Sequence, residues 1–461
     1  MNVVVVGAGF SGTMVAVHLA RQTRTPAAIA LVERTGRFGA GVAYATPHAC
    51  HLLNVPAGRM SAFSRDPDHF LEWAIARDPA VRASSFLPRQ WYSAYLADLL
   101  DAARIQTAKG TSLHRIDSEV TAISRADSRG WQVHCADGSV LSADVVVLAI
   151  GNYPPANPPS QPADFYQSQA YRQDPWAPDA LAVDAGQDVL LLGTGLTMVD
   201  VAVALNHNGH RGRVTAVSRR GLLPQWLRDT APALDGLRLP AGIDAWPRTA
   251  RGLLRGVRDA VAEREREHGG DWRDVFASLR SVTPSLWQSL PLSERRRFLR
   301  HVRPYWDTHR HGAAPAIGET VDRLRRSGQL RVMAARVVGY EMRDDGVYAT
   351  LRRRGGGSLP QIRVDRVINC TGPDTNLARV ASPLIVDLHR RGLIHPDPLA
   401  IGVLTDEAGR VVGRDGVAQE GLYLAGPLTR GRTWEHIAVP ELRDGAEQLA
   451  EQLIEHGVAV G

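Results

Sequence analysis

The chain has 461 residues, 44% of them hydrophobic, so it is long enough to bury more than one domain core. A formal net charge of +6 is modest for this length and gives no reason to expect a nucleic-acid partner. No run approaches the ~20 apolar residues of a membrane span, and the N-terminus lacks signal-peptide features, so we expect a cytoplasmic protein with no membrane partner. The three cysteines, Cys50, Cys135 and Cys370, lie far apart without a CxxC pair, which excludes a disulfide framework and a zinc ribbon.

The chain opens with a predicted strand, a glycine-rich turn and the start of a helix. Four valines precede Gly7-Ala8-Gly9-Phe10-Ser11-Gly12, and a second predicted strand, Ala28–Glu33, ends in an acid. In this pattern backbone amides at the helix N-terminus bind a pyrophosphate, and the acid binds free ribose hydroxyls. We therefore expect an unphosphorylated dinucleotide to be bound by Gly7, Gly9, Phe10, Ser11, Gly12, Glu33 and Arg34.

The next elements are mixed. Helices are predicted over 66–78 and 89–104, and alternating apolar residues predict strands at His114–Ile123, Trp131–Cys135 and Ser139–Leu148. A buried strand, 144–148, ends near Gly151, and the Pro-rich stretch Pro154–Pro162 is typical of a segment that crosses between domains.

A second glycine loop repeats the first at an offset of 186 residues. Val189–Leu192 precede Gly193-Thr194-Gly195-Leu196-Thr197-Met198, and the same offset carries Glu33 onto Arg219. An arginine at this place suits a 2′-phosphate, so this site predicts NADPH and the first predicts FAD. Met198 replaces the third glycine, and Arg219 and Arg220 could instead be a solvated strand end. The predicted NADPH contacts are Gly193, Gly195, Leu196, Thr197, Ser218, Arg219 and Arg220.

Residues 245–330 read as mainly helical, strands return near 331–370, and a terminal helix follows Pro440. The strand Asp365–Cys370 ends near Gly372, as the strand 144–148 ends near Gly151. These features predict an α/β fold of two nested, Rossmann-like, three-layer dinucleotide-binding domains with a helical insertion. We expect the FAD domain over 1–170 plus 340–461 and the NADPH domain over 171–339.

Long ordered motifs resemble the bacterial FAD–NAD(P)-binding family over nearly the whole chain, and more distantly the flavin-dependent N-hydroxylases of ornithine and lysine. The resemblance is carried by GAGFSG at 7–12, GAGVAY at 39–44, HLLNVPA at 51–57, GTGLTMVD at 193–200, SRRGLLP at 218–224, YWDTHRH at 305–311, YLAGP at 423–427 and WEHIAVPELR at 434–443.

The resemblance implies further cofactor contacts. Asn54 would face the flavin ring, Gly41 would lie near the flavin diphosphate or ribityl chain, and Arg89 would contact flavin or NADP. A satisfied structural asparagine at 54 and a plain loop role for Gly41 remain open. Backbone contacts are also expected from Val120, Gly151, Gly372, Gly426 and Ile437.

The helical segment carries histidines and tryptophans. His301, His309 and His311 match no standard zinc spacing, so we expect no metal site. We expect instead a solvated or substrate-lining cluster beside Trp306. Trp272, Trp287 and Trp306 are either core residues or the lining of a substrate pocket or lid.

These features predict an enzyme: an FAD-dependent, NADPH-consuming monooxygenase that oxygenates a nucleophilic nitrogen or sulfur of a small molecule through a flavin C4a-hydroperoxide. Such chemistry depends on a dry, well-shaped cavity more than on strong acid–base groups. An NADPH:acceptor oxidoreductase or substrate dehydrogenase, and a non-catalytic flavin-binding redox sensor, remain open alternatives. A homo-oligomer is possible.

Overall fold

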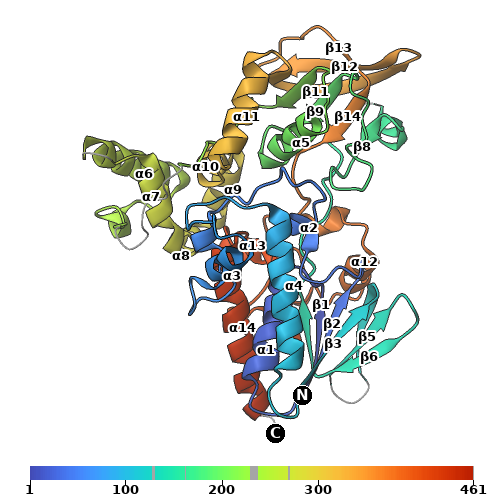
Figure 1. Ribbon diagram of the computed structural model, residues 1–461, viewed down its shortest axis with the longest axis vertical. Helices are drawn as coiled ribbons and strands as arrows, with labels where there is room; N and C mark the ends of the chain where they lie inside the picture. The colour runs from blue at the N-terminus through green and yellow to red at the C-terminus, as the bar shows by residue number, and fades with distance from the viewer. Residues whose placement is uncertain (127–129, 161, 229–236, 268–269, 460–461) are drawn as a thin grey trace.

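The computed structural model describes residues 1–126, 130–160, 162–228, 237–267 and 270–459, with side chains described as far as Glu455. Two parallel sheets stand one above the other along the long axis of the molecule, and a lobe of helices lies beside the junction between them (Figure 1). This arrangement confirms the predicted α/β class with two dinucleotide-binding units.

The first sheet has the strand order β15-β16-β7-β1-β2-β3, and all its strands are parallel except the edge strand β15. Its helices α1, α4 and α14 pack together on one face, where they form a continuous apolar core with the strands. The bounds are β1 Asn2–Val6, β2 Ala28–Glu33, β3 Ser112–Asp117, β7 Val145–Leu148, β15 Arg410–Val412, β16 Ala418–Leu424, α1 Phe10–Gln22, α4 Arg89–Ile105 and α14 Val439–Ala459.

A three-stranded antiparallel sheet and the helix α12 cover the other face. These elements are β4 Val120–Arg125, β5 Trp131–Cys135, β6 Val140–Ala143 and α12 Pro383–Arg390. The single strand predicted at 114–123 is therefore two strands, because the chain leaves the parallel sheet after Asp117 and turns at residues 118–119. Two short helices complete this domain, α2 Gly41–Tyr44 and α3 His69–Arg77.

The second sheet repeats the plan of the first. Its strand order is β13-β12-β11-β10-β9-β14-β8, in which β8, β14, β9, β10 and β11 are parallel and β12 and β13 are antiparallel additions. Helices α5 and α11 pack on one face. The bounds are β8 Tyr171–Arg172, β9 Val189–Leu192, β10 Val214–Ser218, β11 Leu330–Arg343, β12 Gly346–Arg353, β13 Ile362–Val364, β14 Arg366–Asn369, α5 Leu196–His207 and α11 Pro315–Arg326.

The second sheet corrects the predicted domain boundary at residue 340. Strand β11 runs through that position without a break, and β12, β13 and β14 all pair within the second sheet. Residues 340–369 therefore belong to the inner unit, and the chain returns to the outer unit after β14. The prediction failed because it placed the boundary inside a strand. The better markers were Gly151 and Gly372, which follow β7 and β14, where the chain passes from one unit to the other.

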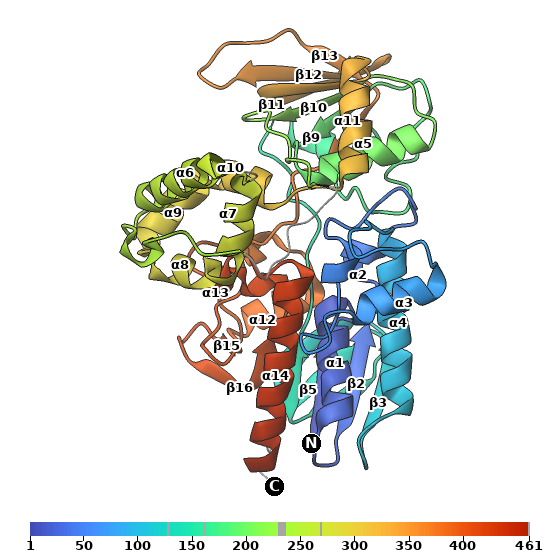
Figure 2. The same ribbon diagram turned by 60° about the vertical axis from the view of Figure 1, so that its left-hand side comes forward.

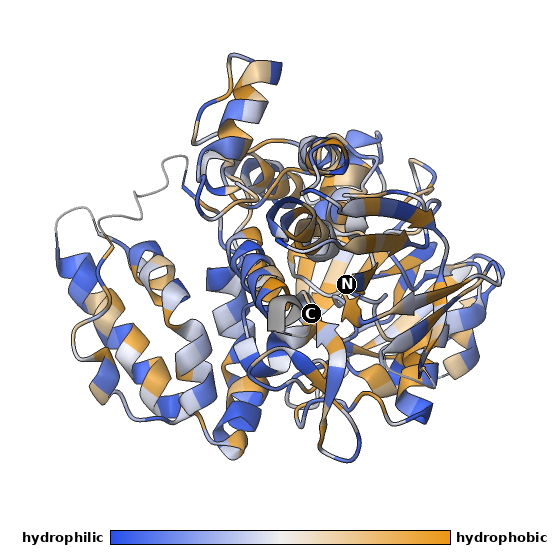
Figure 3. Ribbon diagram, turned by 90° about the horizontal axis from the view of Figure 1, so that it is seen from below, coloured by the Kyte–Doolittle hydropathy of each residue, from blue (hydrophilic) through white to orange (hydrophobic). Residues whose placement is uncertain are grey.

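The helical insertion forms a lobe of α6–α10 that projects from the two sheets (Figure 2). Its small apolar clusters include Trp287, Phe298 and Leu279, and one cluster extends to Trp434 of the outer unit. Its helices show many hydrophilic residues, whereas the strands near the N-terminus are mainly hydrophobic (Figure 3). The bounds are α6 Ala250–Arg266, α7 Trp272–Ser278, α8 Thr283–Ser289, α9 Leu292–His301 and α10 Arg303–Arg310. Across the described residues, every helix is too short or too polar to cross a bilayer.

Candidate functional site: two adjoining cofactor cavities

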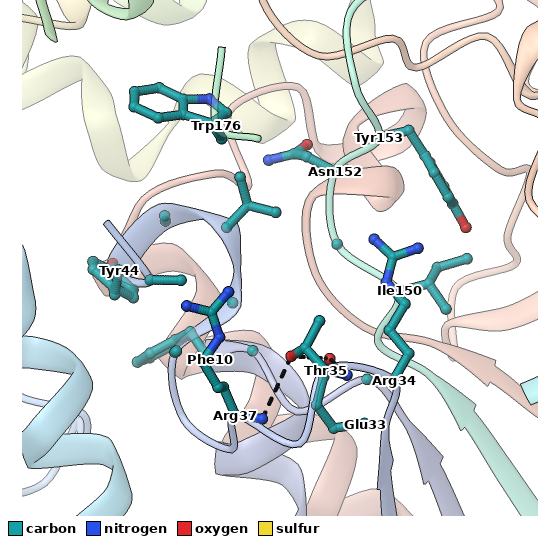
Figure 4. A pocket seen from close by; sticks show the side chains of 18 of the residues that line it. Phe10, Glu33, Arg34, Thr35, Arg37, Tyr44, Ile150, Asn152, Tyr153 and Trp176 are labelled. Atoms are coloured by element: carbon teal, nitrogen blue, oxygen red, sulfur yellow. Dashed lines mark hydrogen bonds between the residues drawn. The ribbon is translucent and has the colours of Figure 1, made fainter. Parts of the chain in front are cut away.

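A cavity of about 820 Å³ opens at the carboxyl ends of the first sheet's strands. This edge is where open α/β sheets bind their ligands, and the volume suits a large cofactor. Glu33, Arg34, Thr35 and Arg37 lie toward one end of the view, and Asn152 and Trp176 lie toward the other (Figure 4). Residues predicted to bind FAD that line this cavity are Gly7, Gly9, Phe10, Ser11, Glu33, Arg34, Gly41, Val120, Gly151 and Ile437.

The glycines of the first loop are required by the backbone. Gly7 has φ +98°, and a Cβ there would overlap the carbonyl oxygen of Ala149. A Cβ on Gly12 would overlap the carbonyl oxygen of Gly7. These contacts bring the first turn of α1 against the loop, so its free amides point into the cavity where a pyrophosphate would bind.

Glu33 holds this loop and still has acceptor capacity for a ribose. One carboxylate oxygen accepts the Ala8 N–H at 2.9 Å, and the other accepts the N–H and the hydroxyl of Thr35 at 3.1 and 2.9 Å. A carboxylate offers about four lone-pair positions. The residues of this cavity therefore fit FAD, with Glu33 as the group that would accept bonds from the adenosine ribose.

A second cavity of about 600 Å³ lies at the corresponding edge of the second sheet. Gly193 has φ +112°, and a Cβ there would overlap the carbonyl oxygen of Cys370, just as Gly7 faces Ala149. Met198 takes the place of Gly12, and its side chain is fully buried in the inner core. The predicted NADPH contacts that line this cavity are Gly193, Gly195, Leu196 and Thr197, and Gly372, expected to make a backbone cofactor contact, lines it too.

The two cavities share lining residues. Asn152 and Ile437 border both, and Asn54 lies in the second cavity beside Val55 and Pro56. Asn54, predicted to face the flavin ring, borders the second cavity and is not among the residues that line the first. Ile437 lies two residues before α14, whose N-terminal amides and dipole favour negative charge.

The predicted NADPH contacts at the end of β10, residues 218–220, are not among the residues that line the second cavity. Ser218 bonds the Thr194 hydroxyl at 2.8 Å and accepts the Gly221 N–H at 3.0 Å, so it shapes the loop. The Arg220 guanidinium stacks on Tyr305 with its centre 5.4 Å from the ring.

Arg219 is exposed at the end of β10, where it belongs to a cluster of arginines. Partial burial and the charges of its neighbours lower the pKa of Arg219; those neighbours are Arg220, Arg336, Arg303 and Arg354. Among the described residues, no carboxylate lies within salt-bridge distance of Arg219. A cluster of arginines in which Arg219 itself makes no salt bridge with a described carboxylate fits a phosphate at this place.

The prediction that Arg89 contacts flavin or NADP is not supported by its position. Its guanidinium makes a bidentate ion pair with Asp200 of α5, at 2.9 and 3.0 Å, and also donates to the carbonyl of Leu52 at 3.0 Å. His51 bonds the carbonyl of Asp200 at 3.0 Å. Arg89 thus joins the two units, and the sequence motif could not reveal this because the partner is 111 residues away.

Four predicted glycines outside the two loops have positive φ: Gly41, Gly151, Gly372 and Gly426. Gly151 and Gly372 follow β7 and β14, and a Cβ at either would meet nothing within 4 Å, so a ligand can approach these backbones closely. Gly426, with φ +99°, faces the Ser11 hydroxyl and so lies beside the first loop rather than in the cavity lining.

The helical lobe forms one wall of the second cavity. Trp272 and His309 line it and pack against each other at 4.9 Å, whereas Trp287 is buried and donates to the carbonyl of Gly431 at 2.9 Å. Of the two roles expected for the tryptophans, Trp272 thus has the lining role and Trp287 the core role.

An ion network fastens this wall to the start of α14. Arg310 pairs with Glu435 at 2.6 Å and with Glu441 at 3.2 Å, and Arg280 makes a bidentate pair with Glu441. The Trp306 indole also donates to Glu435. Although burial opposes it, the pKa of Glu441 is lowered by its bonds to Arg280 and the charge of Arg310, so the carboxylate stays ionised.

Three lining residues were missed by the sequence reasoning: Tyr44 and Trp176 in the first cavity and Arg430 in the second. His311, from the histidine cluster expected to be solvated or to line a substrate site, also lines the second cavity. Tyr44, His311 and Arg430 lie in or beside matched motifs, so the motifs pointed to the region without indicating which side chains face the cavity. Trp176 lies in the crossing segment, which carries no motif.

The fold and its two cavities define a class of protein: a flavoprotein architecture in which one dinucleotide domain is nested in another. Residues 4–153 match the FAD-NAD(P)-binding family. This match confirms the resemblance inferred from the motifs and, with it, FAD and a nicotinamide dinucleotide as the cofactors.

Uncharacterised proteins of Mycobacterium tuberculosis and Mycobacterium bovis are 25% identical over 428 residues, which is 86% of this chain and 77% of theirs. Among solved structures, the L-lysine 6-monooxygenase of Pseudomonas syringae has a TM-score of 0.65 at 16% identity, and the ornithine N-hydroxylase of Kutzneria sp. 744 has 0.62 at 17%. Each comparison covers 99% of both chains.

Reductases share the fold as well. The bacillithiol disulfide reductase of Staphylococcus aureus matches with a TM-score of 0.57 at 12% identity, covering 99% of this chain and 98% of that one. At such identities the likeness establishes the fold alone, so the reaction must be argued from the residues of this chain.

Proposed function

We propose that this protein is an FAD-dependent, NADPH-consuming monooxygenase that oxygenates a nucleophilic nitrogen or sulfur of a small molecule. The observation that carries the proposal is the junction of the two cavities at Asn152 and Ile437. The two cavities adjoin at these residues, and the helical lobe lines the second cavity, where a substrate would lie.

In this proposal, the residues of this chain bind the two cofactors and orient them. The amides of the two glycine loops hold the two pyrophosphates, Glu33 holds the adenosine ribose of FAD, and Arg219 holds the 2′-phosphate of NADPH. When bound, FAD supplies hydride acceptance and oxygen activation. Residues of α7 and α10 line the second cavity and would limit the access of water to the bound cofactors.

The direct test is the fate of the oxygen. Purified protein loaded with FAD is mixed with NADPH in air and with a panel of amines, amino acids and thiols. A monooxygenase consumes NADPH and oxygen in equal amounts and forms an oxygenated product with its substrate. Complete recovery of the consumed oxygen as hydrogen peroxide with every compound would refute the proposal.

A second candidate is an NADPH:acceptor oxidoreductase. Cys370 lines the second cavity, and reductases are among the structures of the same fold. Burial raises the pKa of Cys370 far above its ordinary value, so its thiol stays protonated and is a poor nucleophile. This favours the monooxygenase. Rapid, oxygen-independent NADPH oxidation with a disulfide acceptor would reverse that preference.

Arg219→Ala tests the nucleotide assignment. Charge-assisted bonds contribute about 1.5–3 kcal/mol, so NADPH affinity should fall roughly 10- to 100-fold while NADH affinity changes little. The measurement is the dependence of flavin reduction on each nucleotide's concentration. Arg211→Ala removes the same charge from an exposed site before β10 and serves as the control. Equal losses for NADPH and NADH would remove Arg219 from the phosphate site.

A further inference from the structure

Arginines dominate the charged lining of the second cavity. Asp307 is the one carboxylate that borders it among the described residues, and the arginines that border it are Arg59, Arg228, Arg273, Arg280, Arg303, Arg310 and Arg430. Such a lining attracts anions unless carboxylates behind it compensate the charge.

Most of these arginines form salt bridges with carboxylates of the protein, which balance their charge. Arg228 and Arg273 both pair with Asp271. Arg303 pairs with Asp307 at 3.1 Å, and Arg280 and Arg310 share the carboxylates of the network at α14. The charges of these arginines therefore already have partners within the protein.

Arg430 differs from them. It lies at the start of the short helix α13, Arg430–Thr433, and no carboxylate of the described residues is within salt-bridge distance of its guanidinium. Its Nε is buried and has no hydrogen-bond partner. Burial and the charge of Arg303 lower the pKa of Arg430 to about 10, against the opposing charges of Asp307 and Glu435, so the side chain is still protonated at neutral pH. A partly buried cation without an acceptor is costly and calls for an anion.

The guanidinium is held in place by aromatic rings. Its centre lies 4.8 Å from the ring of Trp434, which is stacked on Trp287 at 4.8 Å. Trp434 itself has φ +54°, a conformation that is strained for a residue other than glycine. Strain of this kind is concentrated at functional sites, and the stacked rings orient the guanidinium in advance of binding.

His311 lies in the same cavity. Its ring makes no hydrogen bond to any described residue, although its backbone N–H bonds Asp307. Burial and the charges of neighbouring arginines, Arg430 among them, hold the pKa of His311 well below its ordinary value, so the imidazole is neutral. A neutral imidazole offers one donor and one acceptor to a ligand.

Arg430 and His311 line the same cavity as the predicted contacts of the second glycine loop, but they belong to other elements of the fold. Arg430 belongs to the outer unit, close in sequence to Ile437 and Ala438, which border the same cavity at the flavin end. His311 follows α10 of the lobe. The loop Gly193–Thr197 and the arginine cluster at Arg219 belong to the inner unit, so they already account for the anionic groups of NADPH.

We propose that Arg430 and His311 form an anion subsite for the substrate, so that the compound oxygenated by this protein carries a carboxylate. The inference rests on the proposed function and names its substrate class. A single guanidinium presents a fork that matches one carboxylate, and the neutral imidazole beside it supplies a further hydrogen bond.

The test measures binding without turnover. Butyrate and butyramide, which have similar size and differ in charge, are titrated into the FAD-loaded protein while tryptophan fluorescence and flavin absorbance are recorded. We expect butyrate to bind at least about tenfold more tightly than butyramide, and Arg430→Gln to weaken butyrate by about tenfold or more. Arg430→Lys, which keeps the charge, should restore part of the loss.

Two controls distinguish a substrate subsite from a general effect of charge and from the NADPH site. Arg300→Gln removes the same charge from an exposed position on α9 and should leave butyrate binding unchanged. Saturating NADP⁺ should not displace butyrate, and Arg430→Gln should leave NADP⁺ affinity within about twofold, well below the loss of a charged bond.

Three results would overturn the inference: equal binding of butyrate and butyramide to the unaltered protein, no loss in Arg430→Gln, or competitive displacement by NADP⁺. The last result would assign Arg430 to the dinucleotide. The first comparison needs no variant, so it stands even if Arg430→Gln does not fold. Failure of the proposed function has a different signature, namely NADPH consumption without oxygenated product, and the fluorescence titration does not depend on it.

Discussion

Gly12→Val is expected to yield a protein that purifies without bound FAD. Any Cβ at residue 12 overlaps the carbonyl oxygen of Gly7 and comes within 3.0 Å of the Ala149 Cβ. The first turn of α1 would have to move away from the loop, and its amides would leave the position where the pyrophosphate binds. Overpacking of this kind also costs about 1–3 kcal/mol of the free energy of unfolding, and occasionally more.

The measurement is the flavin absorbance per chain of the purified protein, before and after incubation with excess FAD. Gly186→Ala is the matched control, because a Cβ at residue 186 meets nothing within 4 Å. Full flavin content in Gly12→Val, in a folded protein, would show that the first loop does not hold the cofactor.

Arg89→Ala is expected to lower the free energy of unfolding by about 3–5 kcal/mol, because it leaves the Asp200 carboxylate buried without its partner. Both side chains are nearly buried, with 12% and 11% of their surfaces exposed. The pair joins α4 of the outer unit to α5 of the inner unit, so the loss should also weaken the contact between the units. Urea unfolding followed by tryptophan fluorescence measures the change.

The double variant Arg89→Met, Asp200→Leu distinguishes two contributions to stability. One is the cost of leaving the Asp200 carboxylate buried without a partner, and the other is the net contribution of the ion pair itself. Replacing a buried ion pair by apolar side chains is often nearly neutral, so the double variant should recover most of the stability lost in Arg89→Ala. Arg24→Ala, at an exposed loop position, is the control and should change stability little. A stable Arg89→Ala would mean that the Arg89–Asp200 pair contributes little to holding the two units together.

The sequence predicted the parts of this molecule that depend on short stretches of chain. The glycine loops, the strands before them and the acid at residue 33 follow from spacings of a few residues, because each loop must turn tightly and open into a helix. The offset of 186 residues exposed the internal repeat for the same reason. The nested order also followed, although the predicted boundary at residue 340 left the end of β11 and the whole of β12, β13 and β14 in the wrong unit.

The side-chain partners could not be predicted in this way. The pairing of Arg89 with Asp200 and of Arg280 with Glu441 joins residues 111 and 161 positions apart. That the Arg430 guanidinium makes no salt bridge with any described residue, and that its buried Nε has no hydrogen-bond partner, becomes visible only when every neighbouring side chain is placed. A spacing pattern carries no information about such distant partners, which depend on how the lobe packs against the outer unit.

The nested order of the two sheets determines the sequence in which they can be completed during synthesis. Strand β16 pairs beside β7 in the outer sheet, yet it is the last long strand of the chain, and the whole inner sheet precedes it. A growing chain on the ribosome therefore possesses every strand of its inner sheet before the outer one can close. Since domains generally fold as units, the inner unit can fold while the outer unit still waits, with its apolar edge at β7 unpaired, for the final segment to emerge.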